Sequence, residues 1–286
     1  MKRIILSTVL FALFSLLCFT GNAQFSIPAL STDYTISFDA SVDGVGNGVY
    51  AGTGFTNTPG VGQLDGNAWE LNGMSDGNKL FDAEATTGDF ARGTTLGSTT
   101  GGFYAYEVET GNFAFGMQPG GTDVTPGYIA LKVINNTGSE VYGIDFSYDV
   151  WVYNNAARSQ KFNGEYSLDG TNWTAIPALA LNTPEAADGT PAWVKTSLTS
   201  TFNASIADAG TLYVRWYTDD LAGTGSRDKI AFDNVKIQMR APEYVDWCNL
   251  STPSLLTIIQ GSTGNIYGEV LKTGVSEAVG HGANIQ

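Results

Sequence analysis

The sequence is poor in the side chains on which most catalytic and metal sites depend. Among 286 residues it has one histidine, His281, and two cysteines, Cys18 and Cys248. Nucleophilic triads need a base that is usually histidine, and zinc sites need clustered histidine or cysteine ligands. We therefore expect neither kind of centre between residues 25 and 240, and no disulfide framework. Stability then depends on a hydrophobic core, for which the 12% aromatic content supplies large side chains.

Basic residues are also scarce. The chain has 14 Lys and Arg against 28 Asp and Glu, a formal net charge of −14. A surface this acidic repels phosphate backbones and anionic membrane surfaces. The composition therefore argues against nucleic acid as a ligand of this module.

Long apolar runs are absent after the first 24 residues. Residues 1–24 combine a short basic start, an apolar run from Ile4 to Thr20 and small or polar residues before Phe25. This pattern is typical of a secretory signal peptide. A membrane anchor is the alternative, but a run of about 17 residues is at the short limit for a span. We expect a protein that is secreted or held at the outer cell surface, with no membrane span after removal of the signal.

No segment shows the hydrophobic periodicity of a long helix. Several segments instead show the two-residue alternation of side chains that is typical of β-strands. Between Val141 and Tyr153, aliphatic and aromatic residues at even positions alternate with a second set at odd positions, and Thr211–Thr218 alternates likewise. Many short strands with glycine-rich turns predict an all-β fold, a jelly-roll-like β-sandwich over residues 25–240. Further strands are predicted at Tyr34–Ala40, Ala68–Leu71, Gly102–Val108, Phe113–Met117, Tyr128–Ile134, Lys161–Leu168, Trp193–Leu198 and Lys229–Ile237.

The composition changes at Ala241. The segments that follow look like two strands of a second β domain, but they comprise too few residues to bury a core. These segments are Val245–Leu250, Gly264–Leu271 and Thr273–Ala278. We expect a linker followed by the truncated beginning of a second β domain.

Four segments occur in this order: Asp65–Gly73, Thr87–Gly93, Tyr166–Trp173 and Gly225–Lys236. Together these four segments resemble the large N-terminal β-sandwich modules of exported bacterial multidomain proteins. The last of them also resembles the final strand of MAM-type and carbohydrate-binding jelly rolls, and residues 244–286 resemble a β module common in cargo of the type nine secretion system. The resemblance implies an accessory module without a defined activity.

Aromatic side chains on two strands predict a glycan-binding surface. They alternate away from the aliphatic faces of their strands, where sugar rings could stack on them and an arginine could bind hydroxyl groups. If the two strands are neighbours, the residues form one platform. Packing of these aromatics beneath long loops, or against another domain, is the alternative. The candidate ligand-binding residues are Trp151, Tyr153, Tyr213, Arg215 and Tyr217.

A calcium site is the second candidate. Asp233 has the parity of Val235 and Ile237, so it points inward unless a bulge intervenes, and a buried carboxylate needs a partner. Asp228 lies close in the sequence, and hard oxygen ligands on loops suit Ca²⁺. An ion pair with Arg92, Arg227 or Lys229, or a turn-capping role, is the alternative.

These features favour a non-catalytic accessory module that binds a glycan. Two alternatives stay open: an appendage of an extracellular nuclease or glycoside hydrolase whose catalytic domain lies beyond Gln286, and a structural adhesion or spacer unit. Glycosidases need only two carboxylates, and Asp145, Asp149 and Glu165 lie on strand faces where a pair could form. Solvated carboxylates that discourage edge pairing are the alternative interpretation of these residues.

Overall fold

The computed structural model describes residues 24–242 with their side chains and the backbone of residues 247–250 and 268–271. The chain divides into two compact units, Met1–Ala241 and Pro242–Gln286. In the second unit, β16 (Trp247–Leu250) and β17 (Gly268–Leu271) form an antiparallel pair. The predicted signal peptide, His281 and the side chain of Cys248 lie outside the described residues. Within the described ranges, no helix has the length and apolarity needed to cross a membrane.

One of the two large sheets of the first unit is built around β14, and we call it the β14 sheet. Its strand order is β1-β9-β14-β11-β12, and β6 pairs with β9 beside β1. All its pairs are antiparallel except that of β1 with β9. The strands are β1 (Ser26–Ile27), β6 (Trp69–Asn72), β9 (Gly127–Asn135), β11 (Ser159–Ser167), β12 (Thr174–Asn182) and β14 (Thr211–Ala222).

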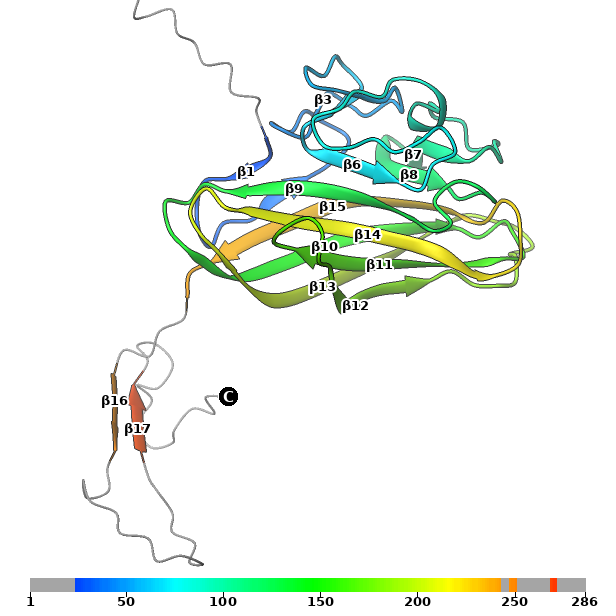
Figure 1. Cartoon of the computed structure of the whole chain (residues 1–286). Helices are drawn as coiled ribbons and strands as arrows, with labels where there is room; N and C mark the ends of the chain where they lie inside the picture. The colour runs from blue at the N-terminus through cyan, green and yellow to red at the C-terminus, as the bar shows by residue number, and fades with distance from the viewer. Residues whose placement is uncertain (1–23, 243–246, 251–267, 272–286) are drawn as a thin grey trace, which may run out of the picture. The chain divides into compact units, whose positions relative to one another are not determined.

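The other large sheet is built around β10, and we call it the β10 sheet. Its order is β13-β10-β15-β8-β7, and β2 pairs with β15 where β8 ends. The two sheets pack face to face (Figure 1), so the predicted all-β sandwich is confirmed. The strands are β2 (Tyr34–Ile36), β7 (Gly102–Glu109), β8 (Asn112–Gln118), β10 (Val141–Tyr153), β13 (Trp193–Ile206) and β15 (Lys229–Arg240).

Aromatic rings from both sheets form the centre of the core. The rings of Trp216 on β14 and Phe232 on β15 are stacked with centroids 4.1 Å apart. Trp69 on β6 stacks on Trp216 at 6.3 Å, and Phe115 on β8 contacts Phe232 at 5.2 Å. Large aromatic side chains bury 150–250 Å² each in typical cores. This cluster explains how a chain without a disulfide framework holds two sheets together.

A layer of loops and short strands precedes β7 and covers one edge of the sandwich (Figure 1). It contains a small sheet of β3 (Gly46–Asn47), β5 (Gln63–Asp65) and β4 (Phe55–Thr56), and a 3-10 helix, η1 (Gly88–Phe90). Lys79 fastens this layer to β6, because its buried ammonium donates hydrogen bonds to the carbonyl oxygens of Gly66, Trp69 and Leu80. Burial lowers the pKa of Lys79 to about 8.

Two edge strands differ from the sequence expectation. β12 has no counterpart among the predicted strands, because a register shift opposite β11 and Pro177 interrupt its alternation. β13 continues eight residues beyond the predicted end at Leu198 and finishes at Ile206. Its residues 199–206 are rich in Ser, Thr and Asn, and only pairing with β10 over their length defines them as strand. Edge strands carry a weak sequence signal because one side faces solvent.

Candidate functional site

The five predicted ligand-binding residues lie on two different sheets. Trp151 and Tyr153 belong to β10, whose neighbours are β13 and β15, whereas Tyr213, Arg215 and Tyr217 belong to β14, whose neighbours are β9 and β11. In both cases the side chains occupy the face opposite the common core. The single platform expected for neighbouring strands is therefore wrong, because the two groups lie on the opposite outer faces of the sandwich.

The Trp151 end of the β10 sheet is an aromatic cluster. Trp151 is only 4% exposed and packs with Tyr104, Tyr106 and Ala231, while Trp193 and Leu96 lie against the same cluster. Trp151 thus follows the packing alternative and presents no open ring face. Tyr153 is partly exposed, and its ring lies 5.4 Å from that of Trp193. We name this set the Trp151 cluster; it consists of Tyr104, Tyr106, Trp151, Tyr153 and Trp193.

A groove of about 350 Å³ crosses the same outer face beside the Trp151 cluster. It runs over β13, β10 and β15, and its lining also includes Tyr148 and Leu198. Its polar lining is Ser147, Asp149, Ser197, Thr199, Asn234 and Lys236. Ligand pockets usually measure about 300–1,000 Å³, so the groove is at the small end of that range. We name it the Asp149 groove.

Asp149 is the centre of that groove. Its side chain is 16% exposed. Ser197 donates a hydrogen bond to Oδ1 over 2.5 Å, Asn234 donates one to Oδ2 over 3.1 Å, and the Lys195 ammonium lies 3.6 Å from Oδ2. The site therefore contains hydroxyl, amide, ammonium and carboxylate groups within one hydrogen-bonded cluster. Groups of this kind bind sugar hydroxyls, which both donate and accept.

Part of this groove could be predicted from the sequence. The alternation of β10 placed Asp145, Ser147 and Asp149 on the outer face, but Ser147 did not stand out as a ligand. Thr199 and Asn234 were missed because the extent of β13 and the bulge in β15 are not visible as patterns. The available signal was the row of small hydroxyl residues in residues 196–201.

Arg215 organises the opposite outer face, on the β14 sheet. Its guanidinium lies 4.1 Å from the ring centroid of Trp173 and 4.9 Å from that of Tyr128. Nε and Nη2 both bond Oε2 of Glu165, at 2.7 and 2.6 Å. The Glu165 carboxylate thus pairs the charge of Arg215, and the two rings cover the guanidinium. As a result, the Arg215 side chain is only 15% exposed. Tyr217 and Tyr213 flank it and are partly exposed.

The predicted calcium ligands do not converge. Asp228 immediately precedes β15, where Oδ1 accepts a 2.9 Å hydrogen bond from the backbone of Ala156. Asp233 is five residues further along an extended strand, a separation of about 16 Å. Among the described residues, no group of three or more His, Cys, Asp or Glu side chains could hold a metal ion. The donor set does not fit Ca²⁺ at these two residues.

A bulge changes the direction of Asp233. Two residues of β15, Asn234 and Val235, face the single residue Tyr148 of β10, and Asn234 has a φ of 51°. Asp233 therefore pairs with Asp149 in the outer row and does not follow the inward parity of Val235. It is 1% exposed and accepts a 3.4 Å hydrogen bond from the backbone of Phe38. Burial, with the nearby carboxylates of Asp39 and Asp149 as smaller causes, raises the pKa of Asp233 to about 6.

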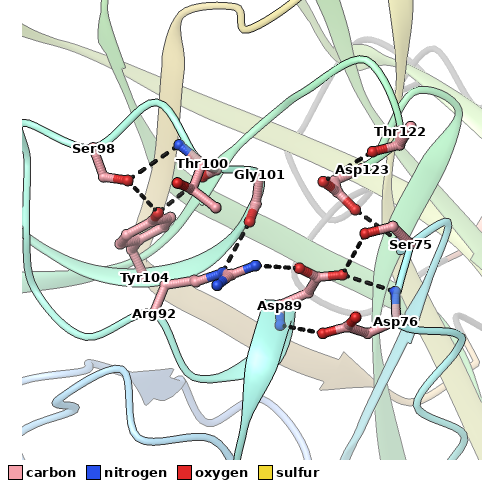
Figure 2. Close-up of polar contacts among 10 residues, drawn as sticks. All are labelled: Ser75, Asp76, Asp89, Arg92, Ser98, Thr100, Gly101, Tyr104, Thr122 and Asp123. Atoms are coloured by element: carbon pink, nitrogen blue, oxygen red, sulfur yellow. Dashed lines mark hydrogen bonds and ion pairs between the residues drawn. The ribbon is translucent and has the colours of Figure 1, made fainter.

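A buried polar network in the loop layer includes three aspartates that the sequence did not single out. Asp89 pairs with Arg92 and accepts hydrogen bonds of 2.9 Å from the Ser75 hydroxyl and the Asp76 backbone (Figure 2). Asp76 accepts a 3.0 Å bond from the Asp89 backbone, and Asp123 accepts a 2.8 Å bond from that of Ser75. These carboxylates therefore hold the loop segments to one another through hydrogen bonds. Arg92 is the partner of Asp89, so the expected alternative pairing of Arg92 with Asp233 is wrong.

The three carboxylates considered for glycosidase chemistry are also engaged. Glu165 pairs with Arg215 on the β14 sheet, and Asp145 pairs with Arg240 over 3.1 Å on the β10 sheet. Asp149 is held by Ser197, Asn234 and Lys195. Glu165 thus lies on the opposite face from the other two, and each carboxylate has a cationic partner.

Comparison with known proteins gives a distant structural similarity. No family model matches the chain, and no curated protein matches it. A carbohydrate-binding module designated CBM4 aligns with a TM-score of 0.32 and 13% identity, over 62% of this chain and 97% of its own. CBM28, a carbohydrate-binding module specific for non-crystalline cellulose, aligns with a TM-score of 0.32 and 10% identity, over 52% of this chain and 86% of its own. The K1 cleaved adhesin domain of Lys-gingipain from Porphyromonas gingivalis W83 aligns with a TM-score of 0.32 and 16% identity, over 74% of this chain and 100% of its own. The similarity concerns the β-sandwich alone.

Proposed function

We propose that this chain is a non-catalytic, secreted binding module that holds a glycan in the Asp149 groove. The observation that carries the proposal is the groove itself, about 350 Å³ of open volume lined by side chains that donate and accept hydrogen bonds. It lies on the outer face of a rigid sheet, so its groups are positioned before a ligand arrives. Preorganisation of this kind lowers the entropic cost of binding.

The chemistry of the lining supports a sugar ligand. The hydroxyls of Ser147 and Thr199 both donate and accept hydrogen bonds, and the remaining lone pairs of the Asp149 carboxylate accept them. The Lys236 ammonium, which also pairs with Asp33 over 3.0 Å, donates them. Tyr153 and Trp193, in the neighbouring rows, are partly exposed aromatics on which a second sugar ring can stack. A few such contacts correspond to about −4 to −6 kcal/mol, or roughly millimolar to tens of micromolar affinity.

The opposite face, with Tyr213, Arg215 and Tyr217, is the weaker candidate. Arg215 is already paired with Glu165 and covered by Trp173. A ligand there would have to displace these contacts before forming its own. We therefore assign glycan binding to the Asp149 groove and expect Tyr217→Ala to leave it unchanged.

A matched pair of variants tests the assignment. Ser197 and Thr201 are both exposed on β13 and both donate to an aspartate of β10, Ser197 to Asp149 and Thr201 to Asp145. Only Ser197 lines the groove. The full chain should be retarded in affinity gels containing its polysaccharide, with a panel of plant and marine glycans as probes. Ser197→Leu should abolish retardation, and Thr201→Leu should preserve it. Equal effects of the two variants, or retardation by no glycan, would refute the proposal.

A further inference from the structure

The Trp151 cluster contains buried polar atoms that have no hydrogen-bond partner among the residues the structure describes. Within the described residues, Nε1 of Trp151, Nε1 of Trp193 and the hydroxyl of Tyr106 are buried and have no hydrogen-bond partner. Trp151 is 4% exposed and Tyr106 is 1% exposed. A buried donor without a partner loses its hydration and gains nothing in return. Phenylalanine would fill these positions without that cost.

The three side chains belong to one contiguous surface. The rings of Tyr106 and Trp193 lie 5.3 Å apart, although they come from β7 and β13 at opposite edges of the sheet. They can reach each other because the residues of the sheet beneath them, Gly116 and Ala231, have little or no side chain. A Cβ added to Gly116 would lie 2.2 Å from the Tyr106 ring, and Trp151 is paired with Ala231. These small residues allow the aromatic rings to approach the backbone of the sheet closely.

The charged groups of this surface are cationic. The Lys195 ammonium lies 5.5 Å from the Trp151 ring centroid, and the Lys229 ammonium lies 5.8 Å from that of Tyr153. Indole N–H groups and ammonium groups donate hydrogen bonds and cannot accept them. Two acidic side chains lie beside this surface, and both have partners. Asp149 is ion-paired with Lys195, and Asp228 accepts a hydrogen bond from the Ala156 backbone. The surface is therefore matched to a ligand group that only accepts.

Leu96 covers this surface. It packs on the Trp151 cluster from the loop between Arg92 and Gly102. That loop is tied down at both ends, since Arg92 bonds Asp89 and the Gly101 carbonyl, and the Tyr104 hydroxyl bonds Ser98 and Thr100 (Figure 2). Residues 94–97 make no hydrogen bond within the described part of the chain. The contact that holds the tip against the cluster is therefore the packing of Leu96, without a hydrogen bond.

We propose that the Trp151 cluster is an anion subsite, which takes a carboxylate or sulfate group of an acidic polysaccharide when Leu96 moves aside. The inference rests on the proposed function, because it names the substrate class of the adjoining Asp149 groove. The two indole N–H groups, the Tyr106 hydroxyl and the two lysines would donate to the anion. A stacked sugar ring would continue over Tyr153 and Trp193 toward Asp149.

The experiment compares ligands that differ only in charge. Titration calorimetry with the full chain in 0.15 M salt would use polygalacturonate and its methyl ester, then κ-carrageenan and its desulfated form. The acidic member of a pair should bind about 10-fold more tightly, an effect in the range of charge-assisted hydrogen bonds. Tyr106→Phe and Trp193→Phe keep the aromatic rings and remove single donors. Each should weaken the preference for the acidic member without lowering the melting temperature, since each removes one of several donors.

Leu96→Ala supplies an independent test, because it removes the cover and should strengthen acidic-glycan binding several-fold. Equal binding of the acidic and neutral members, or unchanged preference in both aromatic variants, would overturn the anion subsite and leave the groove assignment standing. Binding of no polysaccharide by the wild-type chain would overturn both.

Discussion

The side-chain amide of Asn234 donates a 3.1 Å hydrogen bond to the Asp149 carboxylate, across the boundary between β15 and β10. This contact exists because the bulge at Asn234 shifts the register of β15 by one residue. The same bulge sends the Asp233 carboxylate to the outer row, where it bonds the Phe38 backbone at the point where β2 replaces β8 as the neighbour of β15. The groove and the buried acid thus share one backbone irregularity.

The backbone conformation of Asn234 should be measurable as stability. Asn234→Ala should lower the free energy of unfolding by about 1–2 kcal/mol, because it removes the bond to Asp149 and because alanine tolerates a positive φ less well than asparagine does. Asn234→Gly keeps that conformation and loses only the bond to Asp149, so its cost should be smaller. Urea denaturation of both variants checks this. Equal losses would mean that the hydrogen bond, and not the backbone, dominates.

Asp233 should make stability depend on pH. Its folded pKa of about 6 lies above the unfolded value of about 3.9, so the folded state binds more protons between these values. The contribution of Asp233 to the free energy of unfolding is therefore fully present below about pH 4. It is lost as the pH rises from the unfolded pKa through the folded pKa of about 6. The contribution is on the order of 1–3 kcal/mol. Asp233→Asn should flatten the melting temperature between pH 4 and 7, and an unchanged slope would assign the dependence to other groups.

Trp151 should behave as a packing residue. Trp151→Ala should lower the free energy of unfolding by about 3–5 kcal/mol, because the side chain is buried among Tyr104, Tyr106 and Ala231. Tyr217→Ala, at a partly exposed position of the other sheet, should cost much less. Denaturant titration of both variants distinguishes the roles. A Trp151→Ala variant of normal stability would show that this residue is free to contact ligand directly.

Arg215 should matter through its geometry as well as its charge. Arg215→Lys retains the charge but loses the planar contact with Trp173 and the two bonds to Glu165, so about 1–2 kcal/mol of stability should be lost. Arg215→Met should cost more, because Glu165 is left without its cation. A double-mutant cycle with Glu165→Gln measures the coupling. A coupling near zero would place the interaction among ordinary surface ion pairs.

The local sequence determined the fold class and the faces of the main strands. Alternation in Val141–Tyr153 and Thr211–Thr218 separated core from outer positions, since a strand's side chains point to alternate faces whatever its partner is. The shortage of histidine and cysteine similarly underlies the prediction that residues 25–240 hold neither a catalytic triad nor a zinc site. These properties depend on residues close together in the chain.

Only the tertiary structure decided which outer faces meet. The pairing of β10 with β13 and β15, and of β14 with β9 and β11, joins residues far apart in sequence, and no local pattern encodes it. The prediction of one platform from Trp151 to Tyr217 failed for this reason. The bulge at Asn234 lies where the neighbour of β15 changes from β8 to β2. No local pattern encodes this change, so parity alone assigned Asp233 to the wrong face. The burial of Trp151 depends on Leu96 and Trp193, which reach it from a distant loop and an edge strand.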